Sequence, residues 1–141
     1  MKKVLLFVFV FLLLPVIHSY SQIGITAYRY SKIGINTNQN NRIFGEFRIL
    51  TNNQIDETEE FDFSILYNIR RQDRSIIYLG LGLSICPFRE YDNINGIQVP
   101  IGFQIFPLKD IGNLSLLTEI APSTDGESVS IKQLWGLRYN F

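Results

Sequence analysis

The stretch Ile131-Lys-Gln-Leu-Trp-Gly-Leu-Arg-Tyr-Asn-Phe141 carries the pattern that indicates the fold. Every second residue, counted back from the end, is large and apolar or aromatic: Phe141, Tyr139, Leu137 and Trp135. The residues between them are mostly polar or small. Because successive side chains of a strand point to opposite faces, the pattern predicts a strand with one aromatic face and one polar face. In a β-barrel that crosses a membrane, aromatic residues lie at the water interface and the polar face lines the interior.

The same stretch resembles the C-terminal insertion signal of bacterial outer-membrane β-barrel proteins, which ends in Phe with an aromatic residue two positions earlier. The residues that carry the resemblance are Trp135, Leu137, Tyr139 and Phe141. It implies a cell outer-membrane location, contact with outer-membrane lipid and lipopolysaccharide, and insertion by the barrel-assembly machinery. Members of this family serve as membrane anchors, adhesins or contributors to envelope integrity, and a few are enzymes. Trp135, Tyr139 and Phe141, with Tyr67, Phe103 and Phe106, are expected to form an aromatic girdle near the periplasmic rim.

The first residues have the features of an export signal. Lys2 and Lys3 precede the apolar run Val4–Ile17, which spans 14 residues, whereas a membrane-spanning helix needs roughly 20. Ser19 and Ser21 are small residues at the two positions that a signal peptidase reads. We therefore predict a cleaved signal peptide over residues 1–21 and a single domain over residues 22–141. The alternative is an N-terminal anchor helix.

Charge and cysteine content limit the partners of the exported part. Of 13 basic and 13 acidic residues, only the basic Lys2 and Lys3 are removed with the signal, which leaves a net charge of −2. This balance argues against a nucleic-acid partner. The single cysteine, Cys86, cannot form an internal disulfide. A closed ring of backbone hydrogen bonds would stabilise such a domain, and a monomer is expected.

Alternation with a period of two recurs along the chain. It is clearest over residues 61–69, 77–85 and 97–105, where each apolar face is five residues long. The corresponding strands of about ten residues are long enough to cross the hydrocarbon when tilted. Residues 43–50 and 114–121 alternate less regularly. Residues 22–37 are read as two short strands, 22–29 and 32–37; the alternative is a single strand from Ile23 to Asn36, which would give seven strands. The predicted fold is an all-β, eight-stranded antiparallel up-and-down transmembrane β-barrel, with a bulge or break at Pro100.

The two faces of these strands differ in a way that predicts their orientation. One face is rich in Leu and Ile, which suit lipid, and the other carries Gly, Ser and the charged residues, which suit a narrow interior. A charge that faced lipid at mid-depth would cost about 2–4 kcal/mol. The alternative is a soluble periplasmic or secreted lipocalin-like ligand-binding barrel, in which Leu81 and Ile101 would point inward.

The inward charges are expected to form a paired network, because buried charges need partners. The network residues predicted in this way are Glu46, Arg48, Asp62, Glu119 and Arg138, with Arg70 and Lys132 on the same faces. An eight-stranded barrel has an interior just wide enough for its own side chains, so no open pore is expected.

The connections between strands and the missing residue types give further expectations about topology and function. Residues 72–74 and 107–112 are predicted to be short periplasmic turns, and residues 52–60, 88–95 and 123–127 longer outer loops. The run Asp56–Glu60 reads as a solvated acidic loop, with Ca²⁺ binding as the alternative. The only histidine, His18, lies in the predicted signal peptide, so no imidazole remains as a general base. We expect a structural or surface-interaction role, with no catalysis, cofactor or metal site.

Overall fold

The computed structural model describes residues 22–50, 60–87 and 94–141, and these form strands without a helix. Within these ranges no helix is long and apolar enough to span a membrane. The predicted signal peptide, the acidic run except Glu60, and most of the predicted loop 88–95 lie outside the described residues. The strands are β1 (Gly24–Tyr28), β2 (Lys32–Asn36), β3 (Ile43–Leu50), β4 (Phe61–Gln72), β5 (Ser75–Ile85), β6 (Ile94–Gln98), β7 (Ile101–Ile105), β8 (Leu114–Thr124) and β9 (Val129–Asn140).

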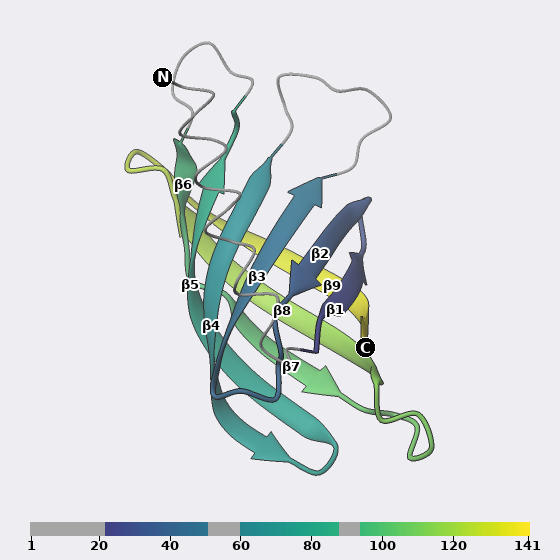
Figure 1. Ribbon diagram of the computed structural model, residues 1–141. Coiled ribbons are helices and arrows are strands. Elements are labelled where there is room, and N and C mark those ends of the chain that lie inside the picture. Colours follow the sequence, from purple (N-terminus) through teal and green to yellow (C-terminus); the bar gives the residue numbers. More distant parts are fainter. Residues whose placement is uncertain (1–21, 51–59, 88–93) are drawn as a thin grey trace, which may run out of the picture.

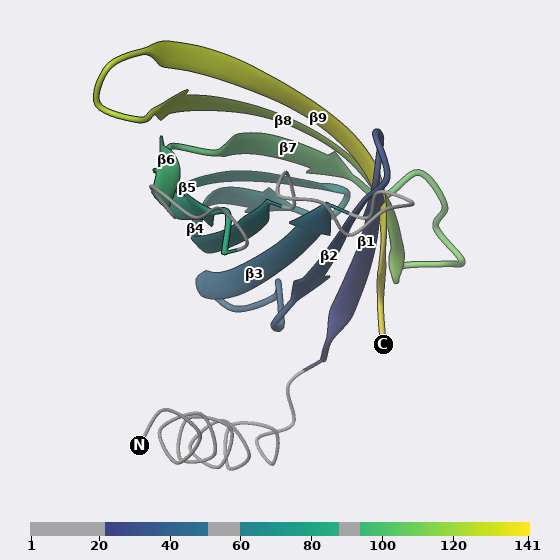
Figure 2. The same cartoon turned by 90° about the horizontal axis from the view of Figure 1, so that it is seen from above.

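The strands close into a barrel, as Figures 1 and 2 show. Apart from β6 and β7, each strand pairs antiparallel with its neighbours in the chain, and β9 pairs with β1 from Gly24↔Asn140 to Tyr28↔Gly136. Strands β6 and β7 lie end to end, and both pair with β5 on one side and β8 on the other. Together they occupy one position in the ring. The predicted eight-stranded antiparallel barrel is therefore confirmed.

The gap between β6 and β7 is the break predicted at Pro100. Proline has no backbone N–H to donate to the ladder. Its carbonyl oxygen still accepts from Gly80 N at 2.8 Å, and Val99 N donates to Pro122 O at 2.8 Å. The sheet therefore remains connected across the interruption, although the strand itself is divided.

Residues 22–37 form two strands, β1 and β2, as predicted. They are joined through Tyr30 and Ser31, whose φ angles are 64° and 56°. The tight reversal therefore holds two residues in the left-handed region, which non-glycine residues seldom adopt. The split supplies the even number of strands that closes the ring.

Two predictions at the strand ends are wrong. The pairing of β4 with β5 shifts between Asn68 and Arg70, and Arg70 is exposed instead of facing the interior. An irregularity of one residue moves the following side chains to the other face. The β8–β9 ladder extends to Thr124↔Val129, so residues 125–128 form a short connection, shorter than the connection over residues 106–113. Loop length alone therefore does not separate the two ends of this barrel.

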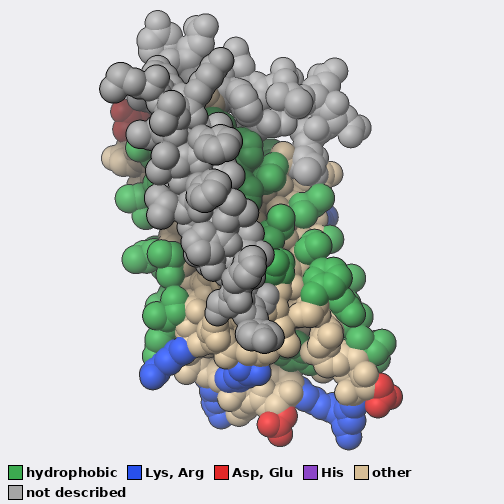
Figure 3. Space-filling view, in the orientation of Figure 1, with side chains coloured by type: hydrophobic (Ala, Val, Ile, Leu, Met, Phe, Trp, Pro, Cys, Tyr) green, Lys and Arg blue, Asp and Glu red, His purple; other side chains and the backbone are tan. Residues whose placement is uncertain are grey.

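Side chains alternate between the two sides of the wall as predicted. The large apolar residues face outward: Ile65 is 68% exposed and Leu81 is 66% exposed. The inward positions hold polar and charged groups, and Arg48 and Arg138 are completely buried. In the space-filling view, hydrophobic side chains lie along both sides of the visible wall, while most of the visible charged side chains gather at its lower end (Figure 3).

A glycine in β7 makes room for a large interior side chain. A Cβ placed on Gly102 would collide with the ring and hydroxyl of Tyr78, which is fully buried. We expect Gly102→Ala to reduce the free energy of unfolding by about 1–3 kcal/mol, because a buried ring must move. Gly112→Ala is the matched control, because nothing lies within 4 Å of its Cβ position. Urea unfolding in detergent micelles measures both, and equal small effects would contradict the prediction.

Candidate functional site

The centre of the barrel holds a network of ion pairs built on Arg48 of β3. Its guanidinium donates to both oxygens of Glu119 of β8, at 2.6 and 2.7 Å. It also donates to Glu46, two residues earlier on the same inward face, at 3.0 Å. All three side chains are buried. Two opposite walls of the barrel are thereby joined by a bidentate charge-assisted contact, which is among the stronger hydrogen bonds in proteins.

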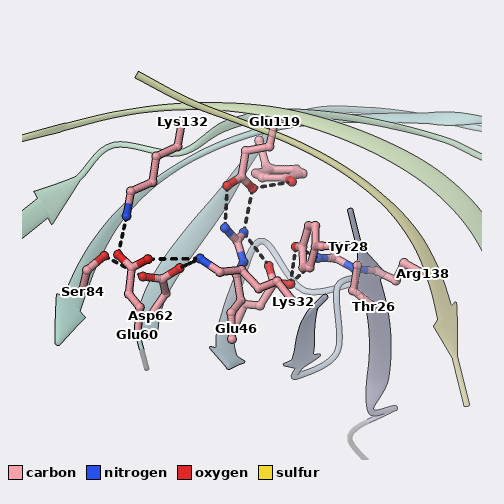
Figure 4. Close-up of polar contacts among 12 residues, drawn as sticks. Thr26, Tyr28, Lys32, Glu46, Glu60, Asp62, Ser84, Glu119, Lys132 and Arg138 are labelled. Atoms are coloured by element: carbon pink, nitrogen blue, oxygen red, sulfur yellow. Dashed lines mark hydrogen bonds and ion pairs between the residues drawn. The ribbon is translucent and has the colours of Figure 1, made fainter. Parts of the chain in front are cut away.

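Arg138 of β9 and two tyrosines complete this central network (Figure 4). Arg138 donates to Glu46 at 2.8 Å and to Thr26 Oγ1 at 2.7 Å. The Tyr28 hydroxyl donates to Glu46 at 2.5 Å, and the Tyr78 hydroxyl donates to Glu119 at 2.8 Å. Each carboxylate therefore accepts from an arginine and from a tyrosine. Two arginines balance two glutamates, so the central network has no net charge.

A second cluster lies beside the central one and contains Lys32 and Asp62. The Lys32 ammonium group donates to Asp62 at 2.6 Å and lies 3.7 Å from Glu60. The Ser84 hydroxyl donates to the other oxygen of Asp62 at 2.6 Å, and Lys132 pairs with Glu60. Figure 4 shows this cluster on the side of the interior away from Arg138. It again combines two cations with two carboxylates.

The residues predicted for the interior network occupy different places. Glu46, Arg48, Glu119 and Arg138 meet in the central network, whereas Asp62 belongs to the second cluster. Lys132 is partly exposed at the edge of that second cluster. The sequence reading missed Tyr28, Lys32 and Tyr78, although the period-two pattern puts each on the same face as its charged or small neighbours.

The network fills the interior and does not surround a channel at its own level. Arg48, Arg138, Tyr78 and Gln104 are among the largest fully buried side chains in the described residues. At the turn end, which is the end of the barrel with the β2–β3, β4–β5 and β7–β8 connections, Gln104 donates to Gln39 at 2.7 Å and to Ser115 at 2.6 Å. The side chains of an eight-stranded barrel suffice to occupy its inside. The arrangement holds the walls of the barrel together.

The residues predicted as insertion signal and girdle lie on the outer face. Trp135, Leu137, Tyr139 and Phe141 are all exposed, and the rings of Tyr139 and Phe141 meet edge to face at 5.1 Å between centroids. Phe106 was predicted to join this girdle, but it packs inward against the cluster of Phe44, Leu66, Ile76 and Tyr78. It follows the end of β7, where the strand alternation no longer holds.

Glu60 lies directly before β4, at the end of the barrel opposite the β4–β5 turn, and its ionisation depends on the second cluster. Burial raises the pKa of Glu60, but the hydrogen bond from Lys132 and the charge of Lys32 outweigh burial, so the pKa lies below its ordinary value of 4.5. A carboxyl with a lowered pKa stabilises the fold above its ordinary pKa, and this contribution is lost as the pH falls through the lowered value.

The wild-type protein should lose unfolding free energy as the pH falls below about 4.5, and Glu60→Gln is expected to make this loss smaller by about 0.5–1 kcal/mol. Lys132→Met should reduce this loss partly, because it removes the hydrogen bond that lowers the pKa. Urea titrations at a series of acidic pH values measure the slopes. An unchanged slope for Glu60→Gln would contradict this assignment.

The described residues offer little for metal or nucleophilic chemistry. They contain no group of three or more His, Cys, Asp or Glu side chains that could hold a metal ion. Ser84 donates its hydroxyl proton to Asp62, as part of the second cluster. Comparison of the chain with protein-family models, with curated proteins and with solved structures finds no match.

Proposed function

We propose that the chain is an integral outer-membrane β-barrel protein with a structural or surface-interaction role, a closed polar interior and no catalysis. The observation that carries the proposal is the distribution of side chains across the wall. Large apolar residues such as Ile65 and Leu81 are exposed, while Arg48, Glu119 and Arg138 are buried. Water-soluble proteins seldom expose contiguous apolar surface of more than a few hundred Å². A lipid environment makes both the outer and the inner face favourable.

The outer face supports this proposal along several strands. Exposed apolar residues recur on β2, β4, β5, β7 and β9, so the apolar surface extends around much of the barrel: Ile33, Ile35, Phe63, Ile65, Leu79, Leu81, Ile101, Phe103, Trp135 and Leu137. Charged side chains gather at the turn end, where Figure 3 shows them below the hydrophobic surface. Lipid and lipopolysaccharide are the partners that suit such a wall, with the barrel-assembly machinery acting during insertion.

The soluble lipocalin-like alternative needs the opposite arrangement. A barrel that binds an apolar ligand has an apolar cavity and a charged, wetted exterior, so Leu81 and Ile101 should point inward. Here Leu81 is 66% exposed and Ile101 is 47% exposed. The interior instead holds the central network, which leaves no apolar cavity at that level. The side-chain arrangement therefore favours the membrane proposal.

Fractionation of cells tests the proposal directly. We expect the protein to stay with the envelope after washes with alkaline carbonate and to be released only by detergent. The folded barrel should also migrate differently on gels before and after boiling, because closed barrels resist denaturation at room temperature. Protease added to intact cells should cut within residues 52–60. Recovery in the periplasmic or medium fraction without detergent would overturn the membrane assignment.

Deletion of Phe141 probes the predicted insertion signal. We expect the deletion to reduce the heat-modifiable, membrane-inserted form to a minor fraction, because the assembly machinery would no longer recognise the terminal strand. Phe103→Leu is the control, since Phe103 is an exposed aromatic residue of the same outer face within an internal strand. Quantitative blotting of envelope fractions gives both values. Normal assembly without Phe141 would remove the insertion signal from the proposal.

A further inference from the structure

The turn end of the barrel contains a cavity of about 340 Å³ that the proposed structural role does not use. Its lining comes from the β2–β3, β4–β5 and β7–β8 connections, together with Gln22 before β1 and Asn140 at the end of β9. The floor includes Gln39, which hydrogen-bonds to Gln104, and Phe106, which packs on the interior cluster. Gln104 also accepts from Arg138 of the central network at 3.3 Å, so one buried side chain stands between the cavity floor and that network.

The charge of the cavity lining is positive. Arg71, Arg74 and Lys109 line it, and Asp73 is the one acidic residue among the lining residues. Arg71 is held in place because it donates to the backbone oxygen of Asn40 at 2.8 Å and to the side-chain oxygen of Asn40 at 2.6 Å. This contact joins the β4–β5 turn to the β2–β3 connection, so one cation of the cavity is fixed before a ligand arrives.

The rest of the polar lining consists of carboxamides, which both donate and accept hydrogen bonds. The six residues of this kind are Gln22, Gln39, Asn40, Gln72, Asn113 and Asn140. The Asn40 amide nitrogen donates to Gln22 at 2.8 Å, and the Asn140 amide nitrogen donates to the Asn113 backbone oxygen at 3.4 Å. Phe106 and Leu108 add apolar surface to the same wall.

From this lining we infer that the cavity binds an acidic saccharide, a sugar unit that carries both hydroxyl groups and a carboxylate. The cations match a carboxylate, and Arg can bind one in a bidentate manner. Sugar hydroxyls donate and accept, as carboxamides do, while the C–H face of a sugar ring can rest on Phe106 and Leu108. A simple anion such as phosphate would satisfy the cations but make no use of the apolar surface of Phe106 and Leu108. The volume lies at the small end of the range of about 300–1,000 Å³ typical of ligand pockets.

The binding of the sugar does not depend on the proposed function. The natural source of the sugar does rest on the proposed function. The cavity lies at the end of the barrel where both Gln22 and Asn140 are found. In an outer-membrane barrel whose C-terminus is periplasmic, this end faces the periplasm. The site would then attach the barrel to an acidic saccharide polymer on that side, which gives the structural role a definite partner.

A binding titration tests the inference with the purified full-length protein in detergent. The probes are N-acetylmuramic acid and glucuronic acid, which differ in the position of the carboxylate, with the neutral N-acetylglucosamine and inorganic phosphate as comparisons. We expect saturable binding of at least one acidic sugar, about tenfold tighter than the neutral sugar, as loss of one charge-assisted contact implies. Binding should also be tighter than that of phosphate, which cannot contact the apolar surface of Phe106 and Leu108. The preferred acidic sugar indicates the source. Lack of saturable binding, or equal binding of phosphate, overturns the inference.

Two double variants with the same charge change locate the site. Arg71→Gln with Lys109→Gln removes two cavity cations and should weaken binding at least about tenfold. Arg42→Gln with Arg70→Gln removes two exposed cations that do not line the cavity and should leave binding unchanged. Equal weakening in both variants would reduce the effect to general electrostatic attraction and overturn the site. Heat-modifiable migration verifies folding, and cell fractionation, scored separately, decides the membrane proposal independently of sugar binding.

Discussion

Arg48→Ala is expected to reduce the free energy of unfolding by about 3–5 kcal/mol, the range for removing one partner of a buried ion pair. Arg48 is fully buried and neutralises both oxygens of Glu119. Without it, Glu119 would keep only the hydrogen bond from Tyr78, and its charge would be buried without a cation. The loss comes mainly from this uncompensated charge and not from the missing contact itself.

Urea unfolding of the protein in detergent micelles or lipid vesicles measures the effect. Arg70→Ala is the matched control, because Arg70 is exposed at the end of β4, and its removal should change stability by less than about 0.5 kcal/mol. Combining Arg48→Ala with Glu119→Gln should recover part of the lost stability, because the second substitution removes the Glu119 charge that Arg48→Ala leaves unpaired. A loss below about 1 kcal/mol for Arg48→Ala would show that the central network does not hold the walls together.

Leu81→Arg is the second change with a large expected effect, about 2–4 kcal/mol of destabilisation in lipid vesicles. Leu81 lies in the middle of β5 and points outward, so in a membrane the arginine would face hydrocarbon. If the barrel with this outward Leu81 were surrounded by water, the arginine would be solvated, and the substitution should change stability by only about 0.5 kcal/mol. The measured loss of unfolding free energy therefore distinguishes a lipid from a water environment around Leu81.

Ile131→Arg provides the control for Leu81→Arg. Ile131 is 71% exposed on the outer part of the β8–β9 hairpin, which Figure 2 shows curving away from the ring of strands. Far from the membrane centre an arginine costs only about 0–1 kcal/mol. Folding both variants into vesicles and unfolding them with urea gives the comparison. Similar small losses for both would contradict a lipid-facing wall at Leu81.

The ion-pair networks explain how a chain with a polar interior can still be stable. Buried pairs add little net stability compared with apolar packing, but each removed partner is costly. Arg48, Arg138 and their glutamates lie on β3 and on the adjacent strands β8 and β9 across the ring, so the correct closure satisfies all four charges at once. A shifted register would leave some of them unpaired. We therefore expect the central network to select one arrangement of the barrel.

Local pattern was sufficient to predict most of the wall. Alternation over Phe61–Ile69, and over residues 77–85 and 97–105, indicated the strands. Because a charge in lipid is costly, the same alternation indicated which face should turn inward. Pro100 indicated the break between β6 and β7, because a proline cannot donate in a ladder. These features depend on neighbours within a few residues, so the one-dimensional chain contains the required information.

Only the closed barrel decided which inward groups meet. Arg48 and Glu119 are 71 positions apart in the chain, and their contact depends on the tilt and register of every strand between them. The same is true of Asp62, which joins Lys32 and not the central network. The irregularity after Asn68 turned Arg70 outward, and the end of β7 turned Phe106 inward, because alternation fails where pairing shifts or stops. The turn-end cavity could not be read from the pattern for the same reason, since it forms only when separate connections come together in space.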